Sequence, residues 1–215
     1  MGPARGVRAA KRGRERVELE RGAEGAGTSG ATAGVHPDVE RVLLPEARIR
    51  ERVRELGLEI ARDFAGRRPL LVGILRGAVI FLADLARAIP MEVRLDFMAV
   101  SSYGRSSRSS GVVRILHDLG ENIEGDDVVI VEDVIDSGLT LAYLRETLAT
   151  RRPRTLKTCT LLQKDSPAAR RVGADYVGFL TPNEFLVGYG LDYADRYRNL
   201  PYVGVLRREV YAGRG

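Results

Sequence analysis

Apolar residues recur at helical spacing near the start of the regular part of the chain. Between residues 45 and 64 they lie four, three, four and four positions apart, with arginine and glutamate between them. This spacing predicts an amphipathic helix over residues 45–64. Its apolar face is formed by Ile49, Val53, Leu56, Ile60 and Phe64.

After residue 68 the pattern changes to short apolar runs without alternation, which is typical of strands covered on both faces. Mostly apolar helical stretches follow two of these runs, over residues 77–89 and 138–148. Strands that alternate with helices predict an α/β fold with a largely parallel sheet. The predicted strands cover residues 69–75, 91–100, 111–116, 127–131, 155–162, 176–180 and 202–206.

The amino-terminal stretch differs in composition from the rest. Residues 1–35 hold seven Lys or Arg, four Glu and eight of the 24 glycines, and they contribute +3 of the net charge of +5. This composition, without apolar periodicity, predicts a disordered basic extension over residues 1–38 and one folded domain over residues 39–211. A solvated tail, a misassigned translation start and contact with nucleic-acid phosphates are the open interpretations of the extension. Its early arginines precede no apolar stretch of a secretory signal, so a cytoplasmic location is expected.

Composition narrows the possible chemistry. The chain has one cysteine, Cys159, and two histidines, His36 and His117. Cys159 lies in an apolar run, which predicts an inert buried thiol and fits a reducing compartment. Histidine-rich zinc sites and most Ser-His-Asp hydrolase schemes lack the side chains they need. Chemistry is therefore expected to depend on carboxylates, lysine and backbone amides.

One segment, residues 128–140, carries the pattern expected of a sugar-phosphate site. Glu132 and Asp133 end a buried strand, where open α/β sheets bind ligands and carboxylates can accept hydrogen bonds from ribose hydroxyls. The turn after them offers successive amides, two hydroxyls and a helix start to a phosphate. Ordinary turn and helix-capping chemistry is the alternative reading of a short match of this kind. The residues of the turn are Asp136, Ser137, Gly138, Leu139 and Thr140.

The complete segment resembles the signature of the type I phosphoribosyltransferases. From about residue 42 to 211 the chain resembles the bacterial hypoxanthine-guanine members of that family. The matching landmarks, in order, are Leu75-Arg76-Gly77, Ser101-Ser102-Tyr103-Gly104, the Glu132-Asp133 pair, Leu162-Gln163-Lys164 and the stretch from Phe185 to Tyr193. The resemblance implies a twisted, mainly parallel sheet flanked by helices, with a small hood from about residues 41–68 and 165–207.

The resemblance also implies an activity and a cofactor. A purine base, hypoxanthine or guanine, would displace pyrophosphate from 5-phosphoribosyl 1-diphosphate, giving IMP or GMP. Glu132 and Asp133 would hold the ribose, residues 136–140 the 5-phosphate, and Asp136 would exchange a proton at purine N7. Mg²⁺ would bind near the diphosphate with Glu132, Asp133 and Asp192.

The remaining site residues are implied by their landmarks. Lys164 would donate to purine O6, which excludes adenine, and Phe185 would stack on the base unless it is a core aromatic. Leu186 and Asp192 would face the edge of the base. Pyrophosphate would meet Leu75, Arg76, Gly77 and Arg198.

Ser102 and Tyr103 would lie on a flexible loop that closes over the reacting centre; an exposed hairpin is the alternative. Two positions depart from the family pattern, because Arg76 and Leu139 stand where relatives often carry lysine. The peptide between Leu75 and Arg76 is cis in some relatives.

Two other functions remain open from the sequence. One is a xanthine- or adenine-preferring phosphoribosyltransferase, against which Lys164 speaks in the case of adenine. The other is a regulator that senses phosphoribosyl diphosphate and binds nucleic acid, which would need a strongly basic face, whereas residues 36–215 carry only about +2. Nucleic acid and membrane are not expected as partners, and a homodimer or homotetramer is expected by analogy.

Overall fold

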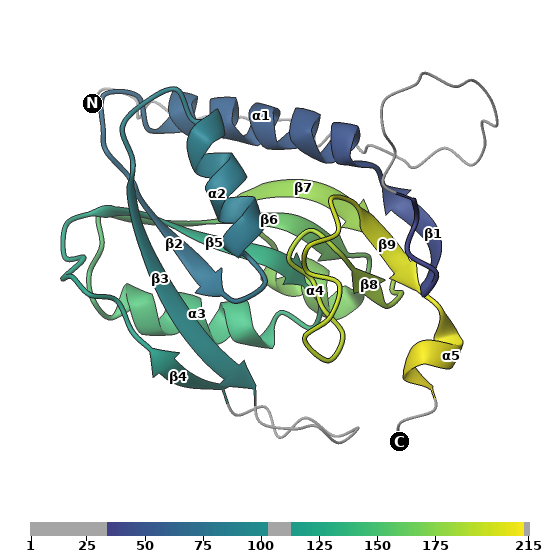
Figure 1. Ribbon diagram of the computed structural model, residues 1–215. Coiled ribbons are helices and arrows are strands. Elements are labelled where there is room, and N and C mark those ends of the chain that lie inside the picture. The colour runs from purple at the N-terminus through teal and green to yellow at the C-terminus, as the bar shows by residue number, and fades with distance from the viewer. Residues whose placement is uncertain (1–33, 103–112, 213–215) are drawn as a thin grey trace, which may run out of the picture. The chain divides into compact units, whose positions relative to one another are not determined.

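Strands and helices alternate along the computed structural model, which describes residues 34–102 and 113–212 (Figure 1). The described residues belong to one compact unit, Ala33–Gly215. The strands are β1 (Val39–Leu44), β2 (Leu70–Leu75), β3 (Arg94–Ser102), β4 (Val113–His117), β5 (Asp127–Ile135), β6 (Thr155–Lys164), β7 (Tyr176–Thr181), β8 (Leu186–Val187) and β9 (Val203–Leu206). The helices are α1 (Glu46–Asp63), α2 (Val79–Ala88), α3 (Leu139–Ala149), α4 (Pro167–Val172) and α5 (Arg208–Tyr211).

Six strands form the main sheet, in the order β4-β3-β2-β5-β6-β7. Only β4 runs antiparallel to its neighbour, so the predicted α/β fold with a mainly parallel sheet is confirmed. The chain proceeds outward from β2 to β3 and from β5 to β6 on the other side. The gap between the ends of β2 and β5 is therefore the switch point at which open α/β sheets bind ligands.

Strand β5 is buried on both faces, which explains its continuous apolar run. Val128 and Ile130 pack in a cluster with the leucines of α3, whereas Val129 and Val131 pack on the opposite face with α1 and α2. All four side chains are fully buried. Burying each contributes about 1.5–3 kcal/mol, so this strand is anchored from both sides.

A second, smaller sheet joins segments that lie far apart in the sequence. Its order is β1-β9-β8, with antiparallel pairing throughout. Strands β1 and β8 and the short helices α4 and α5 do not appear in the sequence prediction. The assignment of residues 41–68 and 165–207 to a separate hood remains a prediction.

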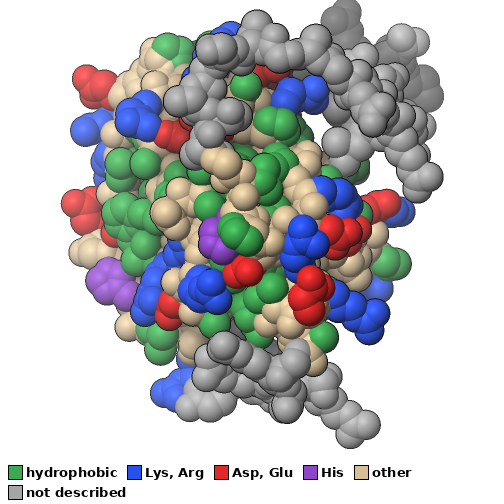
Figure 2. All heavy atoms as spheres, turned by 45° about the vertical axis from the view of Figure 1, so that its right-hand side comes forward, with side chains coloured by type: hydrophobic (Ala, Val, Ile, Leu, Met, Phe, Trp, Pro, Cys, Tyr) green, Lys and Arg blue, Asp and Glu red, His purple; other side chains and the backbone are tan. Residues whose placement is uncertain are grey.

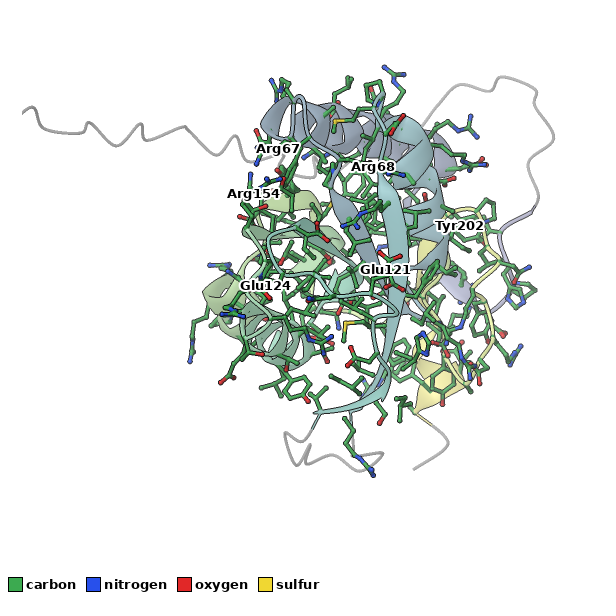
Figure 3. The ribbon with its side chains drawn as sticks, turned by 90° about the vertical axis from the view of Figure 1, so that its left-hand side faces the viewer. Arg67, Arg68, Glu121, Glu124, Arg154 and Tyr202 are labelled. Carbon is green, nitrogen blue, oxygen red and sulfur yellow. The ribbon has the colours of Figure 1, made fainter. Side chains whose placement is uncertain are left out.

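The amino-terminal ends of the main strands carry an ion-pair network. Asp127, the first residue of β5, is 2% exposed and accepts hydrogen bonds from Arg154, Arg67 and Thr155. Arg67 and Arg154 lie next to each other in Figure 3, across the molecule from Tyr202. The hydrogen bond from Arg154 is the main cause that lowers the pKa of Asp127. This network fixes the end of the sheet opposite the switch point.

Two sequence predictions fall outside the described residues. Most of the predicted extension, residues 1–33, is one of them, and the greater part of the predicted closing loop, residues 103–112 with Tyr103, is the other. Ser102 is the last residue of β3 before that gap.

Candidate active site

A cavity of about 270 Å³ opens at the carboxyl-terminal ends of β2 and β5. It brings together residues from three stretches of the chain that the sequence assigned to one site. It is lined by Ile74, Leu75, Arg76, Gly77, Val100, Glu132, Asp133, Val134, Thr140, Asp192 and Arg198.

The acidic pair lies within β5, because the strand continues to Ile135 and does not end at residue 131 as predicted. Glu132 is 7% exposed. Burial, and then the charge of Asp133, raise the pKa of Glu132 well above its ordinary value. Burial also raises the pKa of Asp133 to about 6. A ligand that brings hydroxyl donors or positive charge would stabilise both carboxylates in their charged form.

The turn after β5 leads directly into α3. Gly138 takes a positive φ of 77° and is the N-cap residue of the helix that begins at Leu139, so the N-cap position has no side chain to accept a bond from the helix amides. Ser137 Oγ accepts a long hydrogen bond of 3.4 Å from the Leu139 amide. The amides of a helix start that lacks a side-chain cap can bind an anion. The alternative reading of Asp136 as a helix cap is therefore not supported.

The loop after β2 approaches β5 closely. A Cβ atom at Gly77 would lie 1.6 Å from Asp133 Oδ2, so any larger residue there would force the Asp133 side chain or the loop to move. The peptide bond between Leu75 and Arg76 is cis. Arg76 is largely exposed, and its guanidinium lies 3.2 Å from Asp195 Oδ1.

The third wall comes from the segment after β8. Arg198 donates to the Gly190 carbonyl at 2.8 Å and pairs with Asp192 at 2.8 Å. A Cβ atom at Gly190 would lie 2.1 Å from the Gly77 carbonyl oxygen, so the two loops are in direct contact. Asp192 thus lies with the predicted pyrophosphate group, in the same cavity wall as Arg198.

Lys164 and Asp136, which the sequence placed in separate roles, form an ion pair. Strand β6 continues to Lys164, whose ammonium donates to Asp136 Oδ2 at 2.7 Å. The side chain of Lys164 is 14% exposed and that of Asp136 is 61% exposed. A cationic donor and an anionic acceptor therefore lie side by side at the turn between β5 and α3.

Phe185 belongs to an aromatic cluster that the sequence did not show. Its ring is 37% exposed, stacks on Tyr211 at a centroid distance of 5.0 Å and meets the edge of Tyr193 at 5.4 Å. Tyr211 belongs to α5 and is far from Phe185 in the sequence, so no local pattern could predict that the two rings meet.

Leu186 offers backbone groups at a sheet edge. It pairs with Val205, while the neighbouring Leu206 amide donates to the Phe185 carbonyl. Antiparallel pairing alternates, so the amide and carbonyl of Leu186 point away from β9. Strand β8 is at the edge of its sheet, so these two groups do not pair with another strand of that sheet.

The chain belongs to the phosphoribosyl transferase domain family, which it matches over residues 43–194. Within that family it is 52% identical over 191 residues to the hypoxanthine-guanine phosphoribosyltransferase of Mycobacterium tuberculosis, covering 86% of this chain and 95% of the relative. It is 51% identical over 185 residues to the bifunctional protein TilS/HprT of Listeria innocua, of which it spans 28%.

A solved hypoxanthine phosphoribosyltransferase of Staphylococcus aureus has a TM-score of 0.77 and 44% identity, covering 81% of this chain and 95% of that structure. The resemblance inferred from the motifs is confirmed.

Proposed function

We propose that this protein transfers the 5-phosphoribosyl group of 5-phosphoribosyl 1-diphosphate to N9 of hypoxanthine or guanine. The bond from ribose C1 to N9 forms, the bond from C1 to the diphosphate oxygen breaks, and the base loses one proton. The products are IMP or GMP and pyrophosphate. The observation that carries this proposal is the Lys164–Asp136 pair beside the cavity.

The pair matches one edge of a 6-oxopurine. O6 accepts hydrogen bonds and lies next to N7, so adjacent donor and acceptor side chains suit O6 and a protonated N7. The amino group of adenine would face the ammonium of Lys164 donor to donor, which disfavours it. Asp136 is the general base or acid at N7 in this proposal. The backbone groups of Leu186 that point away from β9 and the ring of Phe185 would complete the base site.

The sugar phosphate fits the cavity walls. Glu132 and Asp133 would accept bonds from the ribose hydroxyls, and the amides of residues 136–140 at the start of α3 would hold the 5-phosphate. Arg198 and the loop of Leu75, Arg76 and Gly77 would hold the diphosphate, the leaving group. Positioning and charge stabilisation supply the catalysis, since the transition state develops positive charge at C1.

Mg²⁺ fits this donor set. Glu132, Asp133 and Asp192 line one cavity with hard oxygen ligands, but the described residues do not gather three acidic, histidine or cysteine side chains into one metal cage. That arrangement suits an ion which keeps several waters and shares ligands with a phosphate. When bound, Mg²⁺ would neutralise charge on the departing diphosphate.

Three further expectations are part of the proposal. The loop with Ser102 and Tyr103 would close over the reacting centre, residues 41–68 and 165–207 would act as a hood, and the protein would form a homodimer or homotetramer. Light scattering would measure the oligomeric state.

Among the described residues, no helix has the length and apolar character that crossing a membrane requires.

A regulator that senses phosphoribosyl diphosphate and binds nucleic acid is the competing function. It would need a basic face for nucleic acid, but the face in Figure 2 mixes acidic and basic side chains. The same face shows apolar side chains between the charged ones. The face in that view therefore does not have the basic character that the regulator would need.

A coupled spectrophotometric assay tests the proposal. Purified protein with Mg²⁺ and 5-phosphoribosyl 1-diphosphate is offered hypoxanthine, guanine, xanthine and adenine separately. Turnover of hypoxanthine or guanine and not of adenine is expected. Faster turnover of xanthine would change the substrate assignment, and binding of the diphosphate without turnover would favour the regulator.

Lys164→Ala in the same assay tests the base site. The KM for hypoxanthine and guanine should rise about tenfold or more, because a hydrogen bond from a charged donor is lost. Lys157→Ala is the matched control. Its ammonium also contacts an aspartate, Asp63, at 2.7 Å, but near the start of β6. Equal KM values in the two variants would contradict the role of Lys164.

A further inference from the structure

A buried tyrosine links the segment after β8, which forms one wall of the cavity, to helix α2, which follows the loop of the opposite wall. Tyr189 is 6% exposed, and its hydroxyl donates to Asp84 Oδ2 at 2.5 Å. Arg87 pairs with the same carboxylate. Burial, and then the bond to Asp84, raise the pKa of Tyr189, so its hydroxyl keeps its proton and remains a donor.

The tyrosine belongs to the segment that carries the third cavity wall. Its amide donates to the Leu200 carbonyl at 2.8 Å, and the amide of Gly190 donates to the Arg198 carbonyl at 2.9 Å. Tyr189 itself takes a positive φ of 50°, between two glycines that also have positive φ. A non-glycine residue in this conformation is held by its surroundings. Here the side-chain bond to α2 is part of what holds it.

The aspartate belongs to the element that carries the opposite wall. Asp84 lies on α2, seven residues after Gly77, and α2 follows directly on the loop of Leu75, Arg76 and Gly77. The two walls already touch at Gly190 and Gly77. Neither Tyr189 nor Asp84 lines the cavity itself. Their bond therefore acts on the site through the backbone that they hold.

We propose that Tyr189 and Asp84 are positioning residues whose bond sets the spacing between Arg198 with Asp192 on one side and the Arg76–Gly77 loop on the other. This inference rests on the proposed function, because that spacing matters as the width of the diphosphate site. Loss of the bond would loosen the grip on the diphosphate. The Lys164–Asp136 pair and the aromatic cluster at Phe185 would keep their geometry.

Tyr189→Phe isolates the bond, because phenylalanine keeps the ring within the hydrophobic core and removes only the hydroxyl. The dissociation constant of inorganic pyrophosphate, measured by calorimetry in the presence of Mg²⁺, should rise about three- to tenfold. The KM for 5-phosphoribosyl 1-diphosphate should rise in parallel, while the KM for hypoxanthine stays unchanged.

Tyr176→Phe is the matched control. Its hydroxyl donates to Asp63 Oδ2 at 2.7 Å, which is the same kind of bond at the first residue of β7 and outside the cavity. This variant should bind pyrophosphate as the wild type does. Asp84→Ala, alone and combined with Tyr189→Phe, should show that the second substitution adds little to the first.

Unchanged pyrophosphate binding in both Tyr189→Phe and Asp84→Ala would overturn the positioning role alone. Equal weakening in Tyr176→Phe would assign the effect to general stability and also overturn it. Failure of the wild type to bind pyrophosphate would overturn the proposed diphosphate site, and the positioning role with it.

Discussion

At the scale of a single residue, the side chain and the backbone of Asp136 have different roles. Its carboxylate meets Lys164, and its backbone begins the turn into α3, whose start it does not cap. The carboxylate is 61% exposed although it is paired with a cation, and in the proposed function it contacts the purine. A substitution that changes only the carboxylate can therefore test its proposed proton exchange separately from the role of its backbone in the turn.

Asp136→Asn keeps the shape of the side chain and removes the proton exchange. We expect kcat to fall about 10²-fold or more, while the dissociation constant of 5-phosphoribosyl 1-diphosphate changes little. Steady-state kinetics and calorimetry on the same preparation measure both values. An unchanged kcat would remove Asp136 as the acid or base.

Single residues also show where sequence reasoning succeeded and where it stopped. The sequence singled out Glu132 and Asp133 because an acidic pair next to a buried apolar run is a local pattern, but it ended the strand before them, whereas they lie within β5. The contact between Asp136 and Lys164 joins the turn after β5 to the last residue of β6, 28 positions apart, and side-chain direction decides it. The need for glycine at position 190 comes from the Gly77 carbonyl, which no local pattern reveals.

At the scale of an element, the loop after β2 is held against β5 with no spare room. Gly77→Ala would place a Cβ atom into the Asp133 carboxylate. We expect a loss of about 1–3 kcal/mol of unfolding free energy, together with weaker pyrophosphate binding. Gly120→Ala is the control, because a Cβ atom there would meet nothing within 4 Å. Thermal unfolding and calorimetry measure the two effects, and similar behaviour of both variants would contradict the expectation.

The short helix α5 supports the aromatic cluster. Tyr211→Ala removes the ring that stacks on Phe185, so we expect the KM for the base to rise about threefold, as the loss of an aromatic pair predicts. Tyr211→Phe should retain the wild-type value. Kinetics with the base varied at saturating 5-phosphoribosyl 1-diphosphate provide the measurement. A lower KM in Tyr211→Ala would mean that this ring competes with the base.

The stability of the whole molecule should depend on pH through three carboxylates, because the pKa of Asp127 is lowered and those of Glu132 and Asp133 are raised. The lowered pKa of Asp127 means that its ionised form favours the folded state, so its contribution is present above about pH 4 and is lost as the pH falls through the lowered pKa. The raised pKa values of Glu132 and Asp133 have the opposite sign. The cost of burying Asp133 appears as the pH rises from about 4 through about 6, and the cost of burying Glu132 appears as the pH rises above its ordinary pKa.

Thermal unfolding of two variants between pH 3 and pH 8 separates these contributions. Asp127→Asn should unfold at a lower temperature than the wild type at pH 7, and the difference should narrow below pH 4. Glu132→Gln should unfold at a higher temperature at pH 8, and its difference should vanish near pH 4. Parallel curves for all three proteins would contradict both assignments.

The architecture of the whole molecule was predictable only in part. The main sheet follows from runs such as Val128–Val131, because burial on both faces leaves a direct mark in the sequence. The small sheet pairs Val39 with Leu206, and its strand β8 has only two residues. Short strands joined over such a separation carry no periodic signal. Their pairing depends on the tertiary structure around them.

The burial of both faces of β5 should also make its amide hydrogens exchange at a different rate from those of the turn that follows it. Amides between Val128 and Val131 should exchange their hydrogens with solvent only when the entire domain unfolds. The amides from Ser137 to Thr140, a few residues later, lie in an exposed turn and a helix start, where small local openings suffice. The amides that we propose to bind phosphate would therefore exchange quickly, directly after a strand that exchanges slowly. Protection of these amides alone would report ligand binding at single-residue resolution.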